Sequence, residues 1–118
     1  MPRRITDADG LAAVRAWQGG ARDRPTTATA VRWTLQQLAA VAPGGSVEVR
    51  VPPFGVAQCV EGLQHRRGTP PNVVETDPAT WLALVTGSRS WPDALAAGEI
   101  SASGRRAHLD GLLPLRGV

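Results

Sequence analysis

The stretch "NVVETDPATWLALVTGSRSWPDALAAGEISASG" contains two capped helices between two short strands, and it constrains the fold more than any other part of the chain. A helix is predicted over residues 77–87, because Asp77 suits the N-cap, Pro78 the first helical position and Gly87 the left-handed end. A second helix is predicted on the same plan over residues 90–98. The flanking "NVVET" and "EISASG" are predicted strands. In the first of these helices Trp81, Leu82 and Val85 are predicted to form one buried stripe, which would pack either against the protein's own core or against something that the protein carries.

The clearest strand pattern is "SVEVRVP", in which Val47, Val49 and Val51 alternate with the charged Glu48 and Arg50. The turn-like "PPFG" joins this segment to "VAQCVEG", so the two are predicted to form a hairpin. The polar segment "LQHRRGTPP" is predicted to be an exposed loop that leads into "NVVET".

Three further helices are predicted from apolar residues at helical spacing. The first covers residues 6–17, where Gly10 weakens the pattern, and residues 18–25 are expected to be a linker or turn. The second covers residues 27–42 and ends at "PGG". The last covers residues 105–113.

The predicted order is helix, helix, strands, two short helices, strand, helix. Hairpin-linked strands gathered between helices favour an α+β layer over a doubly wound parallel sheet. In the closing strand, Ile100 and Ala102 are expected to face inward. A length of 118 residues suits one domain.

The sequence isoelectric point of 10.9 overstates how basic the chain is. All 13 basic residues are Arg and there is no Tyr, so few groups titrate between His and Arg and a small charge excess raises the isoelectric point strongly, whereas the net charge is only +3. The pairs Arg66-Arg67 and Arg105-Arg106 form no long stripe, and aromatic residues are few. We therefore interpret them as solvated surface and expect no nucleic-acid partner.

No pattern of catalytic or metal-ligating residues is visible. Cys59 falls on a predicted strand and is expected to be a small core residue, while His65 falls in the predicted loop. A single cysteine allows no internal disulfide, which fits the cytoplasm. No apolar run reaches the ~20 residues of a membrane-spanning helix. We expect no enzyme activity, no metal and no cofactor.

The segment "VVETDPATWLALVTGSRSWPDALAAGEISASG" resembles the closing half of the sterol carrier protein type-two family. The positions that carry the likeness are Asp77, Trp81, Leu82, Leu84, Gly87, Pro92, Leu95, Gly98, Ile100 and Gly104. The likeness is closer still to small actinobacterial "sterol carrier family" proteins, the group of the bacterial sterol carrier protein orthologue domain. There it extends to "SVEVRVPPFGVAQCVEG" and "RGTPPNVVETD".

The resemblance implies an α+β sandwich with a mostly antiparallel sheet of about five strands, covered by helices on one face. Residues 1–25 would form an N-terminal helix and linker extension, and residues 26–118 the sterol-carrier-like domain. A hydrophobic cavity between sheet and helices would hold a sterol, fatty acid or fatty acyl-CoA, without catalysis. The alternative is a ligand-free interaction or accessory module of the same fold.

The apolar faces predicted above supply the expected lining of this cavity. These residues are Leu35, Leu38, Val49, Val51, Phe54, Trp81, Val85, Trp91, Leu95, Leu109, Leu112 and Leu113. Arg66, Arg67 or Arg89 could meet an acidic headgroup at the mouth. A transient membrane contact, a homodimer and an enzyme partner all stay open.

Overall fold

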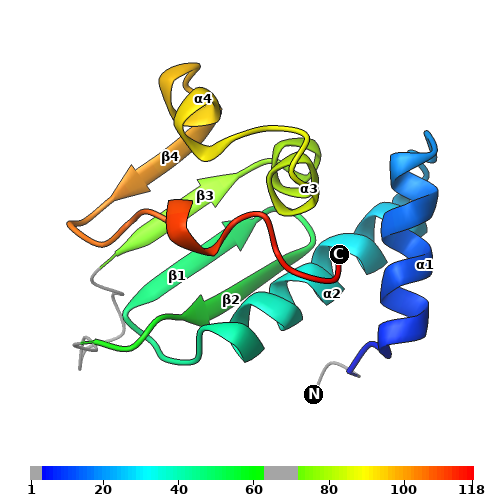
Figure 1. Cartoon of the computed structure of the whole chain (residues 1–118), viewed down its shortest axis with the longest axis horizontal. Coiled ribbons are helices and arrows are strands. Elements are labelled where there is room, and N and C mark those ends of the chain that lie inside the picture. The colour runs from blue at the N-terminus through cyan, green and yellow to red at the C-terminus, as the bar shows by residue number, and fades with distance from the viewer. Residues whose placement is uncertain (1–3, 63–71) are drawn as a thin grey trace.

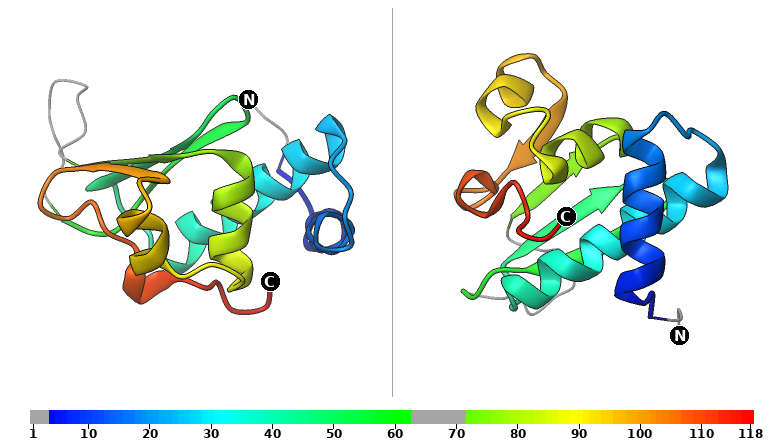
Figure 2. Two further views of the ribbon diagram at one scale, coloured as in Figure 1. Left: turned by 90° about the horizontal axis from the view of Figure 1, so that it is seen from above. Right: turned by 45° about the vertical axis from the view of Figure 1, so that its right-hand side comes forward.

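Helices cover one face of a four-stranded sheet in the computed structural model, which describes residues 4–62 and 72–118 (Figure 1). The elements in chain order are α1 (Asp7–Gln18), α2 (Arg24–Val41), β1 (Val47–Val51), β2 (Gly55–Cys59), β3 (Val73–Thr76), α3 (Pro78–Thr86), α4 (Trp91–Ala96), β4 (Ile100–Ser103) and the 3-10 turn η1 (Asp110–Leu112). Figure 2 shows α2, α3 and α4 on the same side of the sheet. The predicted α+β class is confirmed.

The sheet is mixed, with the order β2-β1-β3-β4. β1 pairs antiparallel with β2, and β3 pairs antiparallel with β4. At the centre, β1 and β3 run parallel, with Glu48 opposite Val73. The expectation of about five mostly antiparallel strands was therefore wrong. Because the hairpin returns the chain to the end of the sheet where β1 begins, β3 starts from that end and runs alongside β1.

The alternating valines of β1 form the floor of the core, as predicted. Val47, Val49 and Val51 are fully buried, whereas Glu48 and Arg50 on the other face are only half-buried. β4 departs from its prediction, since Ile100 is buried but Ala102 is exposed.

The helix α2 begins three residues before its predicted start. The Asp23 carboxylate accepts hydrogen bonds from the backbone N–H of Thr26 (3.1 Å) and from its hydroxyl (2.8 Å). These bonds lower the pKa of Asp23, because they stabilise its charged form. Pro25 then occupies the first turn, where its missing N–H is tolerated. The predicted linker is shorter as a result, and the predicted boundary between residues 25 and 26 falls inside this turn.

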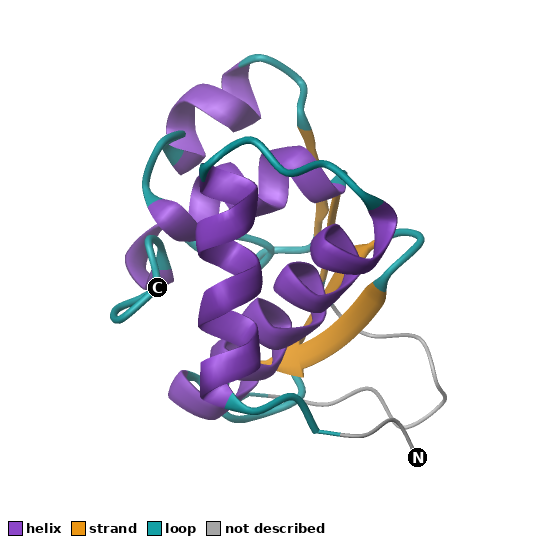
Figure 3. Cartoon of the chain, turned by 90° about the vertical axis from the view of Figure 1, so that its right-hand side faces the viewer, coloured by secondary structure: helices purple, strands orange, loops and turns teal. Residues whose placement is uncertain are grey.

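The helix α1 packs against α2, as Figure 3 shows from the side of α1. Gly10 allows the close contact, because a Cβ atom there would lie 2.0 Å from Cγ of Trp33. The indole N–H of Trp33 donates to the Asp7 carboxylate (3.1 Å). The side chain of Gln36 bonds the backbone of Ile5 in both directions, at 3.1 and 2.8 Å.

The helix predicted over residues 105–113 does not form, and only the short turn η1 is present there. Gly111 lies inside this segment and Pro114 follows it, while an isolated helix of this length is marginal. The segment instead crosses the helical side of the sheet (Figure 1). It buries Leu109, and the backbone N–H of Leu115 donates to the carbonyl of Val85 in α3 (3.1 Å).

Among the residues described, none of the helices combines the length and the apolar character that a membrane crossing needs.

Candidate functional site

Most of the residues predicted to line a cavity lie together in one contiguous core between the sheet and the helices. These are Leu35, Leu38, Val49, Val51, Trp81, Val85, Trp91 and Leu109, each at most 5% exposed. Phe54, Leu112 and Leu113 are half-buried and pack against this core. The sequence therefore identified residues that meet in space. Whether they make room for a ligand stays a prediction.

Leu95 is the exception, because its side chain is 44% exposed. The helix α4 has only six residues and buries Trp91 and Ala94, which lie three positions apart on its inner side. Leu95 is rotated from that side toward solvent.

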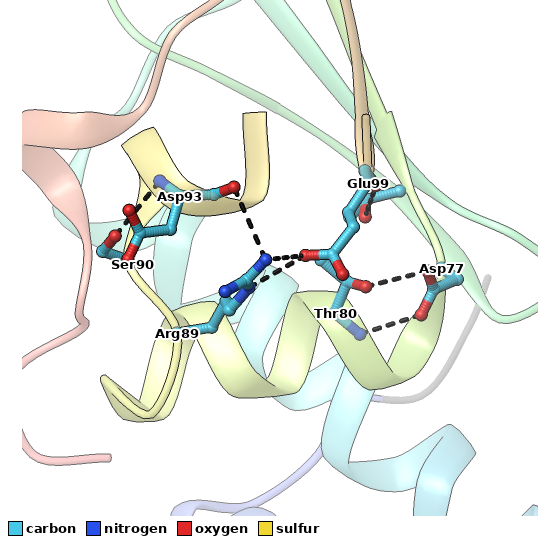
Figure 4. Close-up of polar contacts among 7 residues, drawn as sticks. Asp77, Thr80, Arg89, Ser90, Asp93 and Glu99 are labelled. Atoms are coloured by element: carbon cyan, nitrogen blue, oxygen red, sulfur yellow. Dashed lines mark hydrogen bonds and ion pairs between the residues drawn. The ribbon is translucent and has the colours of Figure 1, made fainter. Parts of the chain in front are cut away.

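Local caps fix the two short helices as predicted (Figure 4). The Asp77 carboxylate accepts hydrogen bonds from the N–H and the hydroxyl of Thr80, both at 2.8 Å. The Ser90 hydroxyl accepts a hydrogen bond from the backbone N–H of Asp93 (3.2 Å). Because α3 is held in this way, Trp81 points into the core, where its indole N–H donates to the buried hydroxyl of Thr34 (2.8 Å).

Of the three arginines predicted at the mouth, the structure describes Arg89. Arg66 and Arg67 lie outside the described residues. Arg89 is engaged in an ion pair with Glu99 at 2.8 Å and donates to the carbonyl of Asp93 at 3.4 Å (Figure 4). Together with Trp91 and Leu113 it lines a depression of about 150 Å³. Ligand pockets for molecules of drug size occupy about 300–1,000 Å³, so this depression is too small for a lipid chain.

A larger hollow lies where the end of α2 faces the C-terminal segment, and we call it the C-terminal pocket. Its volume is about 640 Å³. Its lining residues are Ala42, Pro43, Val60, Glu61, His108, Gly111 and Leu112. Apolar side chains make most of the wall, while Glu61 and His108 are exposed. Of the residues predicted to line a cavity, Leu112 belongs to this pocket.

One wall of the C-terminal pocket has an unusual backbone. Val60 has φ +67°, a left-handed conformation that a β-branched residue rarely adopts. Its N–H donates to the carbonyl of Ala42 (2.7 Å), and its carbonyl accepts from the backbone N–H (3.0 Å) and hydroxyl (2.9 Å) of Ser46. A Cβ atom at Gly44 would lie 2.2 Å from this same carbonyl. The surrounding bonds thus hold a strained residue in place, and such strain is concentrated at functional sites.

Arg106, which was predicted to be solvated surface, is exposed and lies beside this pocket. The guanidinium of Arg106 donates to the carbonyl of Glu61 (3.1 Å). Its backbone N–H donates to the side-chain carbonyl of Asn72 (2.8 Å), and the Asn72 amide donates to the carbonyl of Ser46 (2.7 Å). Asn72 thereby ties the starts of β1 and β3 to the C-terminal segment. The sequence signal for this role was limited to a polar residue immediately before a strand.

The described residues offer little for covalent or metal chemistry. Cys59 is fully buried, and burial raises the pKa of its thiol to about 11, so it stays protonated near neutral pH. His65 lies outside the described residues. Within residues 4–62 and 72–118, no group of three His, Cys, Asp or Glu side chains could hold a metal ion.

A second hollow, which we call the edge groove, runs between α2 and the outer edge of β2. Its volume is about 510 Å³. The lining residues are Arg4, Ile5, Arg32, Leu35, Gln36, Ala39, Phe54, Gly55, Val56, Ala57 and Gln58. Two of the predicted lining residues, Leu35 and Phe54, lie in this groove and not in the C-terminal pocket.

In the comparison with known proteins, one family match covers the four strands of the sheet and the helices α2, α3 and α4. A family model described as bacterial SCP ortholog matches residues 23–115. The match begins at the N-cap of α2 and ends at Leu115, so α1 lies outside it. No sequence among curated proteins matches the chain.

Proposed function

The chain belongs to the family of bacterial SCP orthologs, and on this premise we propose that it binds a single-chain amphiphilic lipid in the C-terminal pocket and carries it without chemical change. Fatty acids and fatty acyl thioesters are single-chain amphiphiles of this kind. The observation behind the proposal is a pocket with apolar walls, about 640 Å³ in volume, at the end of the layer between α2 and the C-terminal segment.

Transfer of the lipid tail out of water would drive binding. Each methylene group that leaves water contributes about 0.8 kcal/mol. Ala42, Pro43, Val60 and Leu112 provide the apolar surface for several such groups. The hydrogen bonds that hold Val60 fix this wall before the ligand arrives, which reduces the ordering cost of binding.

The polar end of the ligand would lie at the rim. Arg106 uses one N–H to bind the carbonyl of Glu61, and a guanidinium has five donors in all. His108 lines the same pocket. A carboxylate or phosphate placed between these two side chains would receive charge-assisted hydrogen bonds and stay in contact with water.

Gly111 offers a direct test. Gly111 lines the pocket, and a Cβ atom built there meets nothing within 4 Å, so Gly111→Phe adds a large side chain at the pocket wall without a backbone clash. Ala16→Phe places the same side chain at an exposed position on α1 and serves as the matched control.

We expect native mass spectrometry of the wild-type protein to show bound lipid and a fluorescent fatty acid to bind saturably at micromolar concentration. Gly111→Phe should weaken this binding at least tenfold, and Ala16→Phe should leave it unchanged. Absence of saturable binding to the wild-type protein would refute the carrier proposal. Equal lipid binding by both variants would show that the lipid site lies outside the C-terminal pocket.

A second candidate function is an accessory module that binds no lipid. The observation in its favour is that eight of the twelve predicted lining residues are at most 5% exposed within a contiguous core. The same titration separates the two candidates, because a module with a filled core would show neither copurified lipid nor saturable binding.

A further inference from the structure

The outer edge of β2 has backbone hydrogen-bonding groups that point away from the sheet. The N–H of Glu48 donates to the carbonyl of Asn72 on the β3 side, so the backbone groups of the odd-numbered residues of β1 face β2. Since Val49 lies opposite Ala57, the backbone groups of Ala57 are directed to β1. Those of the alternate residues Val56 and Gln58 therefore point outward, and among the described residues no strand pairs with them.

This open stretch has defined ends. At one end the Phe54 carbonyl accepts a hydrogen bond from Nε of Arg32 (2.9 Å). At the other end the N–H of Val60 donates to the carbonyl of Ala42 (2.7 Å). Between them, Val56 and Gln58 offer two N–H donors and two carbonyl acceptors. An added strand of about five residues would span the stretch, at a rise of about 3.3 Å per residue.

The edge groove lies beside this open stretch, so an added strand would also contact side chains. Leu35 and Ala39 of α2, together with Ile5, provide apolar surface on the helical side. Val56 provides apolar surface on the opposite face, where it is 59% exposed. Alternate side chains of an added strand would meet these two surfaces in turn.

The charge around the edge groove selects the kind of partner. Arg4 and Arg32 line it, and the guanidinium of Arg24 lies 5.2 Å from the ring centre of Phe54. Within residues 4–62 and 72–118, none of these three arginines forms an ion pair with a carboxylate. We propose that the edge groove is a docking site for an extended acidic segment of a partner protein, which adds a strand to β2 and neutralises these arginines.

Two other occupants fit the same surface less well. A bilayer would leave the outward N–H and carbonyl groups of Val56 and Gln58 without partners in hydrocarbon, at a cost of several kcal/mol each. A second copy of the chain would bring its own positively charged arginines and a further net charge of +3. An acidic extended segment satisfies both the backbone groups and the charges.

The test uses the full chain and a fluorescein-labelled peptide Glu-Val-Ile-Val-Glu, which reads the same in both directions. Fluorescence anisotropy should show saturable binding with a Kd on the order of 10–100 μM, in the range of weak peptide contacts. The peptide Lys-Val-Ile-Val-Lys should not bind. Higher salt should weaken the interaction, because the charges are exposed and screened.

Two sets of protein variants separate the backbone contribution from the charge contribution. Gln58→Pro removes an outward donor at an edge position that tolerates proline, and it should weaken binding about tenfold. Gln58→Thr keeps that donor and should bind as the wild-type protein does. Arg4→Gln with Arg24→Gln should also weaken binding, whereas the exposed pair Arg15→Gln with Arg105→Gln, which changes net charge equally, should not. Circular dichroism establishes that each variant is folded.

Several results would overturn the proposal. One is that the wild-type protein shows no saturable binding of the acidic peptide. Another is that folded Gln58→Pro binds the peptide as tightly as the wild-type protein does. Binding to phosphatidylserine vesicles in preference to the peptide would identify a membrane as the occupant. A dimer in sedimentation that Gln58→Pro dissociates would identify a second copy. Gly111→Phe should leave peptide binding intact, so this test is independent of the lipid proposal.

Discussion

The indole N–H of Trp81 donates a 2.8 Å hydrogen bond to the hydroxyl of Thr34, forty-seven residues earlier in the chain, and both side chains are fully buried. The Thr34 hydroxyl in turn donates to the carbonyl of Ala30 at 2.7 Å. The bond between Trp81 and Thr34 joins α2 to α3 inside the core. It satisfies the one polar group that Trp81 brings into an apolar region.

Removal of the hydroxyl at this contact should destabilise the protein. Thr34→Val keeps the shape of the side chain but leaves the indole N–H unpaired, which costs about 1–3 kcal/mol. Thr34→Ser, which keeps the acceptor, should cost less. Urea denaturation followed by tryptophan fluorescence measures the difference. In the double variant with Trp81→Phe the loss should be smaller than the sum of the two single losses.

Gly10 should not tolerate a side chain. Alanine is the better helix former by about 1 kcal/mol, yet its Cβ atom would overlap the ring of Trp33. We expect Gly10→Ala to lower the free energy of unfolding by about 1–3 kcal/mol, as overpacked cores do. Gly111→Ala adds a Cβ atom in open space and is the control. A Gly10→Ala protein as stable as the wild type would show that α1 can shift along α2 without penalty.

Asn72 should be needed both for stability and for the shape of the C-terminal pocket. Asn72→Ala removes the partners of the Ser46 carbonyl and of the Arg106 N–H. A loss of about 2–4 kcal/mol is expected, because two buried or half-buried groups are left unpaired. Asn72→Asp retains an acceptor for the Arg106 N–H but directs a carboxylate oxygen at the Ser46 carbonyl in a buried position, so it should lose at least as much. Thermal unfolding gives the stability, and fatty-acid titration of the folded variants shows whether Arg106 remains in place.

The stability of the protein should fall in alkali because of Cys59. Burial raises the pKa of this thiol to about 11, whereas in the unfolded chain a thiol ionises near pH 8.5. Between these values the folded protein retains a proton that the unfolded chain releases, so the free energy of unfolding decreases as pH rises. Below about pH 8 the thiol has no such effect.

The chain is suited to this measurement because it contains neither Lys nor Tyr, the side chains that usually titrate in alkali. The decrease should disappear in Cys59→Ala. The native thiol should also react slowly with iodoacetamide at pH 8 and rapidly in urea. Rapid reaction of the native protein would contradict the buried position of the thiol.

Features that depend on a few neighbouring residues could be predicted from the sequence. The caps at Asp77 and Ser90 are present because a side-chain oxygen bonds an N–H three residues ahead, a geometry fixed by spacing alone. The alternation of Val47, Val49 and Val51 predicted the buried face of β1 for the same reason. The likeness of the C-terminal stretch to sterol carrier proteins was confirmed by the family match.

Features that depend on distant partners could not be predicted in this way. The β1–β2 hairpin returns the chain to the end of the sheet where β1 begins, and β3 then pairs with β1 in parallel. No local pattern encodes which strand β3 joins. Gly10 looked like a weak point of its helix, although it is the contact that admits Trp33. The C-terminal pocket depends on the left-handed backbone of Val60, a conformation that its residue type disfavours.

The central pairing of β1 with β3 also divides the chain into two consecutive halves. α1, α2, β1 and β2 precede the junction, and β3, α3, α4 and β4 follow it. Each half has its own antiparallel strand pair, and the halves meet through the parallel strands and the Thr34–Trp81 bond. The protein should therefore show fragment complementation. Residues 1–62 and 72–118, coexpressed as separate polypeptides, should copurify as one folded heterodimer, and Thr34→Val should weaken their reassembly.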